Sequence, residues 1–263
     1  MFRMKKPTPL RLAYEIVTSS PRSLYNMLFG CSIRITSDQV VLDLLGQGFS
    51  FVRWGDGETA IVRKKSISYQ KFSLNLSEKL ENLSSNPPGR LVFGLPWVAY
   101  ASPFDRRWNK RIFGIMFSTR VYWAKRYRNQ FLNVTISRTE FWWEHANQIP
   151  AILQRLQDQG RKLILVGSGH FLAICPPKTQ LIELKKSDAF SDYETLCKSV
   201  NEVYCANREN LTLIVSAGPT AKALVNDFGN LMQVLDIGHG LNFALNGFGS
   251  WAWSKRETEQ KEK

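Results

Sequence analysis

Apolar residues in this chain gather in short runs that alternate with stretches of helical periodicity. Seven runs rich in Val, Ile, Leu and Phe predict β-strands, and they span residues 49–54, 90–95, 131–136, 162–167, 179–184, 211–218 and 232–238. Between several of them, residues 139–160 and 219–229 have the spacing of helices. This alternation is typical of an α/β fold, in which a mostly parallel sheet is covered by helices on both faces. We expect a single Rossmann-like domain.

The ends of the chain lack this alternation. We expect residues 1–47 to form a basic, partly helical N-terminal extension and residues 48–250 to form the folded domain. Residues 251–263 end in mixed charges without apolar residues, which predicts a disordered tail. No window approaches the roughly 18 apolar residues of a membrane span, and the first residues lack the features of a signal peptide. The sequence therefore predicts a cytoplasmic protein.

The charge balance points to an anionic partner. The chain of 263 residues has 35 Lys and Arg against 22 Asp and Glu, a formal net charge of +13. Residues 106–128 contain eight basic residues, six aromatic residues and no acid. Such a segment suits anionic lipid or nucleic acid, or it is a helix with an aromatic core face and a solvated basic face. Both interpretations stay open at this stage.

Glycine-rich turns follow four of the predicted strands. They occupy residues 54–58, 166–170, 216–222 and 236–240. Glycine lets the backbone turn tightly and approach a ligand, and the N-terminus of the following helix offers N–H groups to phosphate. In parallel α/β sheets, ligands bind at the carboxyl ends of the strands. One such turn is weak evidence, but several at one sheet edge predict a binding site there.

The turn at residues 54–58 holds two carboxylates, Asp56 and Glu58, on either side of Gly57. Residues two apart converge only in an extended segment or turn, so both side chains can reach one ligand if the helix starts at or after them. Converging carboxylates suit Mg²⁺ or Mn²⁺. The alternative is helix capping, with Asp56 as the N-cap residue and Glu58 in the first turn.

The sequence around these turns resembles bacterial glycosyltransferases of the GT-D fold, which have a D-x-E motif. Six segments stand in the family order between about residues 48 and 245: "SFVRWGDGE", "NVTISRTEFWW", "KLILVGSG", "SDAFSDYETL", "SAGPTAKALVNDF" and "VLDIGH". Many relatives have an acidic residue in the turn where this chain has Gly167, Ser168 and Gly169. The resemblance identifies residues 48–250 as a GT-D-like catalytic domain.

The resemblance implies a metal-dependent hexosyltransferase that uses a nucleotide-diphospho-sugar, and we expect this donor to be a UDP-sugar. Its acceptor would be a glycan, lipid-linked or protein-linked group in surface polysaccharide or glycoprotein synthesis. Mn²⁺ or Mg²⁺ would be held by Asp56 and Glu58, with His239 completing the shell. The implied nucleotide-sugar-binding residues are Arg53, Gly55, Gly57, Arg138, Gly167, Ser168, Phe190, Gly218, Pro219, Thr220 and Lys222.

Glycosyl transfer also needs a stabilised leaving diphosphate and, in an inverting reaction, a base near the acceptor hydroxyl. Asp236 and His239 are candidates for that base or for the metal shell, and the sequence does not choose between Asp236 and Asp56. His145 and His170 are interpreted as structural. Asp188 and Asp192 could be site residues, but capping of a helix at the surface explains them equally well.

Two other function classes remain. A Rossmann-type methyltransferase would use residues 162–169 as its glycine loop, but no acid stands at the usual distance for a ribose. A nonenzymatic basic protein would bind nucleic acid or anionic membrane through its charge. For the favoured enzyme, nucleic acid is not an expected partner, and the basic segment predicts peripheral attachment to the inner face of the cytoplasmic membrane.

Overall fold

The computed structural model of the chain describes residues 19–29, 33–101, 110–126, 134–185, 187–207 and 210–247, together with Tyr14 and Cys31. At the C-terminal end, the expected tail of residues 251–263 lies outside the described residues. The basic segment 106–128 is described only in part, since its first residues and its last two fall outside these ranges.

The centre of the protein is a seven-stranded sheet in which every strand pair is parallel. The strand order is β3-β2-β1-β7-β6-β4-β5. The strands are β1 (Ser50–Arg53), β2 (Leu91–Leu95), β3 (Thr135–Arg138), β4 (Lys162–Gly167), β5 (Gln180–Glu183), β6 (Leu211–Val215) and β7 (Gln233–Asp236). All seven predicted strands are present, and the expected α/β class with a mostly parallel sheet is confirmed.

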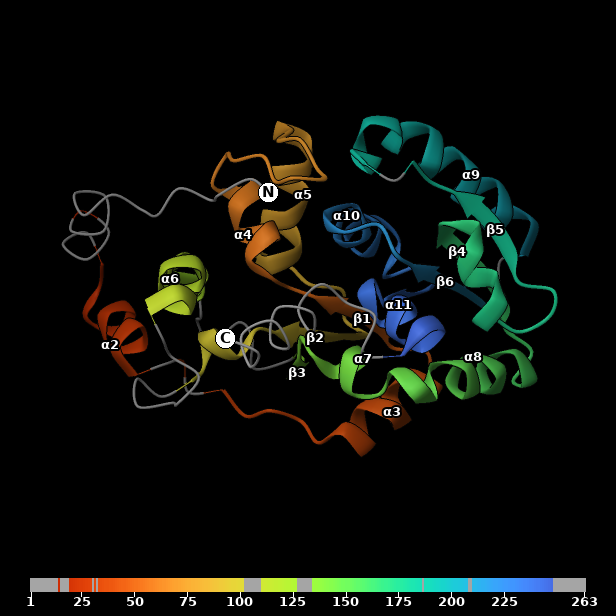
Figure 1. Cartoon of the computed structure of the whole chain (residues 1–263), viewed down its shortest axis with the longest axis horizontal. Coiled ribbons are helices and arrows are strands. Elements are labelled where there is room, and N and C mark those ends of the chain that lie inside the picture. The colour runs from red at the N-terminus through yellow and green to blue at the C-terminus, as the bar shows by residue number, and fades with distance from the viewer. Residues whose placement is uncertain are drawn as a thin grey trace, which may run out of the picture.

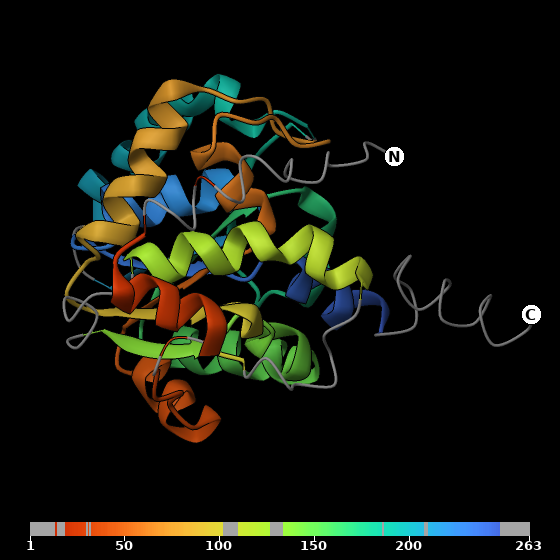
Figure 2. The ribbon, with the colours of Figure 1, turned by 90° about the vertical axis from the view of Figure 1, so that its left-hand side faces the viewer.

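Helices cover both faces of this sheet (Figures 1 and 2). The helices are α2 (Pro21–Phe29), α3 (Asp38–Gly46), α4 (Asp56–Val62), α5 (Leu74–Ser85), α6 (Lys110–Arg126), α7 (Phe141–Glu144), α8 (Ile149–Asp158), α9 (Tyr193–Asn207), α10 (Pro219–Phe228) and α11 (His239–Asn246). Short 3₁₀ turns are η1 (Trp97–Ala99), η3 (Ala146–Gln148), η4 (Gly169–Ile174) and η5 (Ala189–Asp192).

Each face of the sheet has its own hydrophobic core, because successive residues of a strand point to opposite faces. In β1, Val52 belongs to the core beneath α4, α5, α9 and α10, whereas Phe51 belongs to the core beneath α3, α7, α8 and α11. Both side chains are fully buried. Val41 and Leu45 of α3 also pack in the second core, so the chain contributes to the folded core before residue 48.

The predicted helix over residues 139–160 is divided into α7, η3 and α8. Pro150 lies in the first turn of α8, where the missing N–H costs nothing and the fixed φ suits a helix start. Proline has no N–H to donate to the carbonyl four residues earlier, so one continuous helix cannot keep its hydrogen bonds through Pro150. The other predicted helix, over residues 219–229, is confirmed as α10.

Within the described part of the chain, no helix is both long enough and apolar enough to cross a membrane.

Candidate active site

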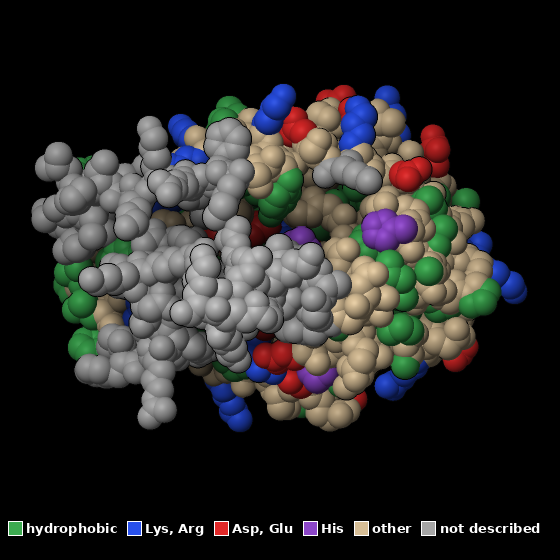
Figure 3. All heavy atoms as spheres, in the orientation of Figure 1, with side chains coloured by type: hydrophobic (Ala, Val, Ile, Leu, Met, Phe, Trp, Pro, Cys, Tyr) green, Lys and Arg blue, Asp and Glu red, His purple; other side chains and the backbone are tan. Residues whose placement is uncertain are grey.

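Three neighbouring strands, β1, β7 and β6, end at the same edge of the sheet. Each is followed by a glycine-containing turn and then by a helix: α4 after β1, α11 after β7 and α10 after β6. Figure 3 shows acidic and histidine side chains in a hollow near the centre of one face of the molecule. The parallel arrangement therefore brings together segments that lie far apart in the sequence.

Asp236, the last residue of β7, lies at the bottom of this edge and is fully buried. One of its carboxylate oxygens, Oδ2, accepts the backbone N–H of Arg53 at 3.0 Å. The Arg53 side chain in turn donates from Nε to the Asp236 carbonyl at 3.2 Å, and its Nη2 lies 3.6 Å from Oδ1. These contacts fasten the end of β1 to the end of β7.

Lys222, in the second turn of α10, is 2% exposed and lies between two carboxylates. Its Nζ is 2.9 Å from Glu58 Oε1 and 2.8 Å from Asp236 Oδ2. The same nitrogen donates to the Gly218 carbonyl at 3.3 Å. An ammonium group buried to this degree is stable only when it is paired and hydrogen-bonded. Lys222 therefore links α10, α4 and β7 into one cluster.

The two carboxylates of the D-x-E motif have different surroundings. Helix α4 begins at Asp56 with Gly55 as its N-cap, and Glu58 is the third helical residue, 5% exposed. Glu58 Oε2 accepts the N–H of Gly55 at 2.8 Å, which is the side-chain half of a capping box. The capping interpretation is thus correct for Glu58, although Gly55 rather than Asp56 is the N-cap. Because the helix begins at Asp56, before Glu58, the condition expected for convergence of the two carboxylates is not met.

Asp56 makes no ion pair with Lys222 in the described structure, and its pKa is raised. The causes are burial first and the neighbouring charge of Glu58 second. The charges of Glu58 and Asp56 also raise the pKa of the Tyr69 phenol, after the larger effect of its partial burial. The D-x-E carboxylates and Tyr69 are therefore close enough to share one electrostatic environment.

Gly218 and Gly238 have φ values of +54° and +52°, in the left-handed region that favours glycine. A Cβ on Gly218 would lie 2.8 Å from Tyr69 Cε2, and a Cβ on Gly238 would overlap the Arg53 guanidinium. Both turns therefore need glycine for backbone conformation and for space. We expected these glycines to let the backbone approach a ligand, but in the structure the space beside them is occupied by the side chains of Tyr69 and Arg53.

The turn before α10 offers fewer free N–H groups than a helix N-terminus usually does. Pro219 has no N–H, and the N–H groups of Thr220 and Ala221 donate to the carbonyls of Ala217 and Gly218. Thr220 is fully buried, and its hydroxyl donates to Gln70 Oε1 at 3.4 Å. A phosphate held here would rely on Lys222 more than on the backbone.

His239 opens α11 directly after the turn at Gly238. Burial, together with the smaller effects of the positive charges of Arg53 and Lys222, lowers the pKa of its imidazole to about 4. The ring is therefore neutral at pH 7, the form in which histidine ligates metals or accepts a proton. Its roles as metal ligand or base stay predictions.

The site residues fit a divalent cation in chemistry and in charge. Three carboxylates, those of Asp56, Glu58 and Asp236, face the two cations Arg53 and Lys222, which leaves −3 + 2 = −1. Asp236 Oδ1 is buried and accepts no hydrogen bond from the described residues. Among those residues, no three His, Cys, Asp or Glu side chains are already gathered around one point, because Lys222 occupies the space between Glu58 and Asp236.

Arg138 lies apart from this cluster, at the end of the edge strand β3. Its guanidinium forms ion pairs with Asp38 at 2.7 Å and with Glu144 at 2.6 Å. Asp38 also accepts a hydrogen bond from His145 Nε2 at 2.9 Å. The structure thus surrounds Arg138 with partners that hold α3 and α7 to β3, and donor binding by Arg138 stays a prediction.

Gly167 ends β4, two strands away from β7, and Ser168 follows it as the N-cap of η4. The Ser168 hydroxyl lies 2.7 Å from His170 Nδ1 on the exposed turn η4. Phe190 is 7% exposed and stacks on Tyr193, with ring centroids 4.6 Å apart. These three predicted residues are therefore not part of the Lys222 cluster.

Sequence reasoning missed Tyr69 and Gln70, in the loop between α4 and α5. Tyr69 covers Gly218, and Gln70, 2% exposed, hydrogen-bonds to Asp188 Oδ1 at 2.6 Å. The loop has no glycine and no periodicity, so the sequence carries no local signal for it. In the structure, the loop is recognised as part of the site because Gln70, a polar residue, is buried and hydrogen-bonds to residues far away in the sequence.

No model of a known protein family matches the chain. A curated protein, the probable glycosyl transferase Gly of Streptococcus gordonii, is 28% identical over 220 residues. The match covers 78% of this chain and 31% of that protein, so the chain spans about a third of the relative's length.

Solved structures share the fold. A selenomethionine structure of domain of unknown function 1792 has a TM-score of 0.56 and 20% identity, covering 86% of this chain and 82% of its own. A structure described as a new glycosyltransferase with this domain, from Streptococcus sanguinis, has a TM-score of 0.56 and 24% identity, covering 82% of this chain and 85% of its own. These similarities confirm the predicted Rossmann-like fold, which the two solved structures share with this chain.

The cluster around Lys222 predicts a strong effect of Lys222→Met on stability. The substitution leaves Glu58 and Asp236 buried without their shared cation, so we expect a loss of about 3–5 kcal/mol in the free energy of unfolding. Urea denaturation measures it, with the exposed Lys198→Met on α9 as the matched control. Adding Glu58→Gln should recover part of the loss, since it removes one unpaired charge. A loss no larger than that of the control would contradict this account.

His239 predicts a pH dependence of stability. Its pKa is about 4 when folded and 6.5 when unfolded, so between these values the unfolded chain binds more protons. The contribution of His239 to stability is therefore lost progressively as the pH falls from 6.5 towards 4. An NMR titration in EDTA should place the ring's pKa near 4, and His239→Gln should lose less stability between pH 7 and pH 5 than wild type. A ring that titrates near 6.5 refutes the prediction.

Proposed function

We propose that the chain is a glycosyltransferase that moves a sugar from a nucleotide-diphospho-sugar, a UDP-sugar for preference, to a hydroxyl acceptor. The observation that carries this is the cluster of Asp56, Glu58, Asp236, Arg53 and Lys222 at the carboxyl ends of β1, β6 and β7. Ligands bind at this edge in parallel α/β sheets. The names of the relatives with the same fold support the same reaction.

The cationic residues suit a leaving nucleoside diphosphate. Lys222 and Arg53 are fixed by hydrogen bonds before any ligand arrives, so they need little reorganisation when charge develops on the diphosphate. To reach phosphate oxygens, the Lys222 ammonium would exchange its contact with Glu58 for one with the ligand. Glu58 would then be free to hold a cation.

The charge of the site is the reason for proposing a divalent cation. A diphosphate adds negative charge to a cluster that already carries −1 by the count above, and this repulsion opposes donor binding. Mn²⁺ or Mg²⁺ held by Asp56 and Glu58, with His239 or Asp236 completing the shell, would supply Lewis-acid stabilisation of the leaving diphosphate.

Deprotonation of the acceptor hydroxyl is the second requirement. Asp236 is fully buried and fastened by Arg53 and Lys222, so it is poorly placed to receive a proton. The neutral imidazole of His239 suits that role better, in which case Asp236 rather than His239 would complete the metal shell. We propose a glycan, lipid-linked or protein-linked acceptor in surface polysaccharide or glycoprotein synthesis.

Metal-dependent donor binding tests the proposal. We expect UDP to bind wild type in Mn²⁺ and to bind at least about tenfold more weakly in EDTA, a difference of about 1.4 kcal/mol. Asp56→Asn should remove the effect of Mn²⁺ without loss of stability, because its raised pKa means that the fold already disfavours the charged form. Calorimetric titration measures both, and Glu78→Gln, an exposed change on α5, is the control.

Equal UDP affinity in Mn²⁺ and in EDTA, for wild type and for Asp56→Asn, would contradict the metal site. Glu58→Gln is a less direct probe, because it also removes the ion pair with Lys222. Release of UDP from a panel of UDP-sugars then identifies the donor. Stabilisation by S-adenosylmethionine instead of UDP would favour the methyltransferase alternative.

In the described part of segment 106–128, Tyr122 and Trp123 pack in the core and the buried Arg120 donates to the carbonyls of Val98 and Ala101. We also propose that the remaining basic residues of this segment attach the protein to anionic membrane. Lys and Arg near such a surface contribute about 1 kcal/mol each, and salt screens the attraction. Sedimentation with anionic vesicles should fall between low and high salt, and neutral vesicles should bind none. Equal recovery in the supernatant with both vesicle types at low salt would leave the segment as a solvated helix face.

A further inference from the structure

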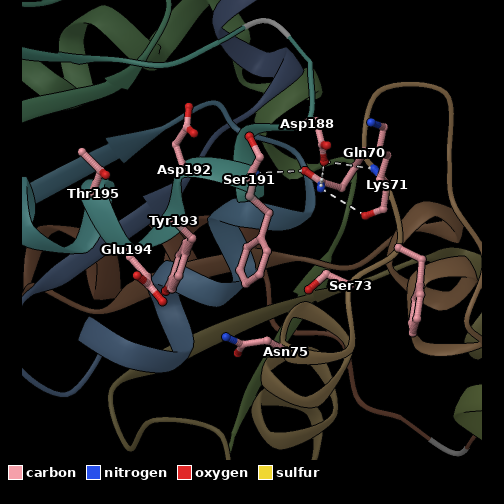
Figure 4. Close-up of a pocket in the computed structure, with 12 residues that line it drawn as sticks. Gln70, Lys71, Ser73, Asn75, Asp188, Ser191, Asp192, Tyr193, Glu194 and Thr195 are labelled. Atoms are coloured by element: carbon pink, nitrogen blue, oxygen red, sulfur yellow. Dashed lines mark hydrogen bonds between the residues drawn. The ribbon is translucent and has the colours of Figure 1, made fainter.

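A pocket lies beside the candidate active site, and the proposed glycosyl transfer gives its residues no role. It opens between the loop that precedes α5 and the turn η5 that leads into α9 (Figure 4). Its volume is about 480 Å³, within the roughly 300–1,000 Å³ of small-molecule sites. The lining residues are Gln70, Lys71, Phe72, Ser73, Asn75, Asp188, Phe190, Ser191, Asp192, Tyr193, Glu194 and Thr195.

The pocket and the active-site cluster share one wall, formed by Tyr69 and Gln70. Tyr69 packs over Gly218 on the side of the cluster, and Gln70 lines the pocket. The side chain of Gln70 accepts the Thr220 hydroxyl at 3.4 Å and the Phe190 N–H at 3.3 Å. Tyr69 is 46% exposed and precedes Gln70 directly, so it lies at the surface between the pocket and the Lys222 cluster.

Hydrogen bonds fix this wall before any ligand binds. Asp188 donates its N–H to the Tyr69 carbonyl at 2.7 Å and accepts from the Gln70 side chain at 2.6 Å and the Lys71 N–H at 3.2 Å. Figure 4 draws the hydrogen bonds that Asp188 accepts from Gln70 and Lys71 as dashed lines. On the floor, the hydroxyl of Tyr193 donates to Asp227 at 2.8 Å. The pocket is therefore preorganised.

The charges of the lining disfavour phosphate. Asp188, Asp192 and Glu194 face the single cation Lys71, a balance of −3 + 1 = −2, and Lys185 outside the lining pairs with Asp192 at 2.6 Å. This local excess of acid contrasts with the net charge of +13 for the whole chain. A neutral ligand avoids the repulsion that a diphosphate would meet.

The remaining lining groups suit a ligand rich in hydroxyls. Asn75, Ser191 and Thr195 are exposed and offer both donors and acceptors. Phe190 and Tyr193 are buried beneath the pocket, and the half-buried Phe72 adds the apolar surface for the C–H face of a sugar. Carboxylates accept strong hydrogen bonds from neutral hydroxyls.

We propose that this pocket binds the acceptor as a neutral sugar ring, on the opposite side of the Tyr69–Gln70 wall from the donor diphosphate. The inference rests on the proposed glycosyl transfer. The wall keeps the charged leaving group on the side of Lys222 and Arg53, and the acceptor hydroxyl reaches the donor sugar past Tyr69.

Saturation-transfer NMR tests the pocket. The probes are the methyl glycosides of glucose, galactose and N-acetylglucosamine, each with UDP and Mn²⁺ present. Thr195→Trp fills the pocket from an exposed position on α9, and Asn201→Trp places the same side chain on α9 outside it. We expect at least one glycoside to bind wild type and the Asn201 variant, and to bind about tenfold more weakly or not at all to Thr195→Trp, since the indole occupies its space.

The affinity for UDP, measured on the same samples, separates the two proposals. Unchanged UDP binding in Thr195→Trp, with loss of the glycoside, supports an acceptor pocket. Weaker UDP binding in that variant would assign the pocket to the nucleotide and overturn the inference. Binding of UDP to wild type without any glycoside would also overturn it while leaving the proposed function intact, whereas glycoside binding without UDP binding would support the pocket and refute the proposed donor.

Discussion

The ammonium group of Lys222, held between Glu58 and Asp236, is the interaction on which the candidate site depends. It connects a helix that follows β6, a helix that follows β1 and the last residue of β7. Each partner would be costly to bury alone, because an unpaired charge in the interior loses its hydration. The three segments are therefore stable in this arrangement only together, and their positions define the geometry of everything around them.

This arrangement keeps charged groups in place at the expense of stability. Apolar residues of similar volume are often at least as stabilising as a buried ion cluster, so the cluster is better explained by chemistry than by folding. The left-handed turns at Gly218 and Gly238 fit the same view, since each lets the backbone pass close to Tyr69 or Arg53. The fully apolar cores on the two faces of the sheet supply the stability that the cluster does not.

The strands and the position of the site could be predicted from the sequence, because parallel strands have continuous apolar runs and their carboxyl ends carry the glycine turns. Glu58, Asp236 and Lys222 stand at those ends. Tyr69 and Gln70 could not be predicted, because a loop has no periodicity and its partners, Gly218 and Asp188, are more than a hundred residues away. Arg138 lies two residues beyond the end of the predicted strand 131–136, and its partner Asp38 lies in a helix a hundred residues earlier that no local pattern connects with it.

The strand order has a consequence for biosynthesis. Among the described strands, β7 is the last in the sequence, yet it is inserted between β1 and β6 in the middle of the sheet. Until the ribosome has released the residues near 236, the strands β3-β2-β1 and β6-β4-β5 share no edge, and each set presents an unpaired inner strand to other chains. Asp236, the hydrogen-bond partner of Arg53, lies 183 residues later in the sequence and is therefore synthesised much later. A nascent chain thus has no candidate active site, and its two half-sheets are the segments that most need protection from aggregation during translation.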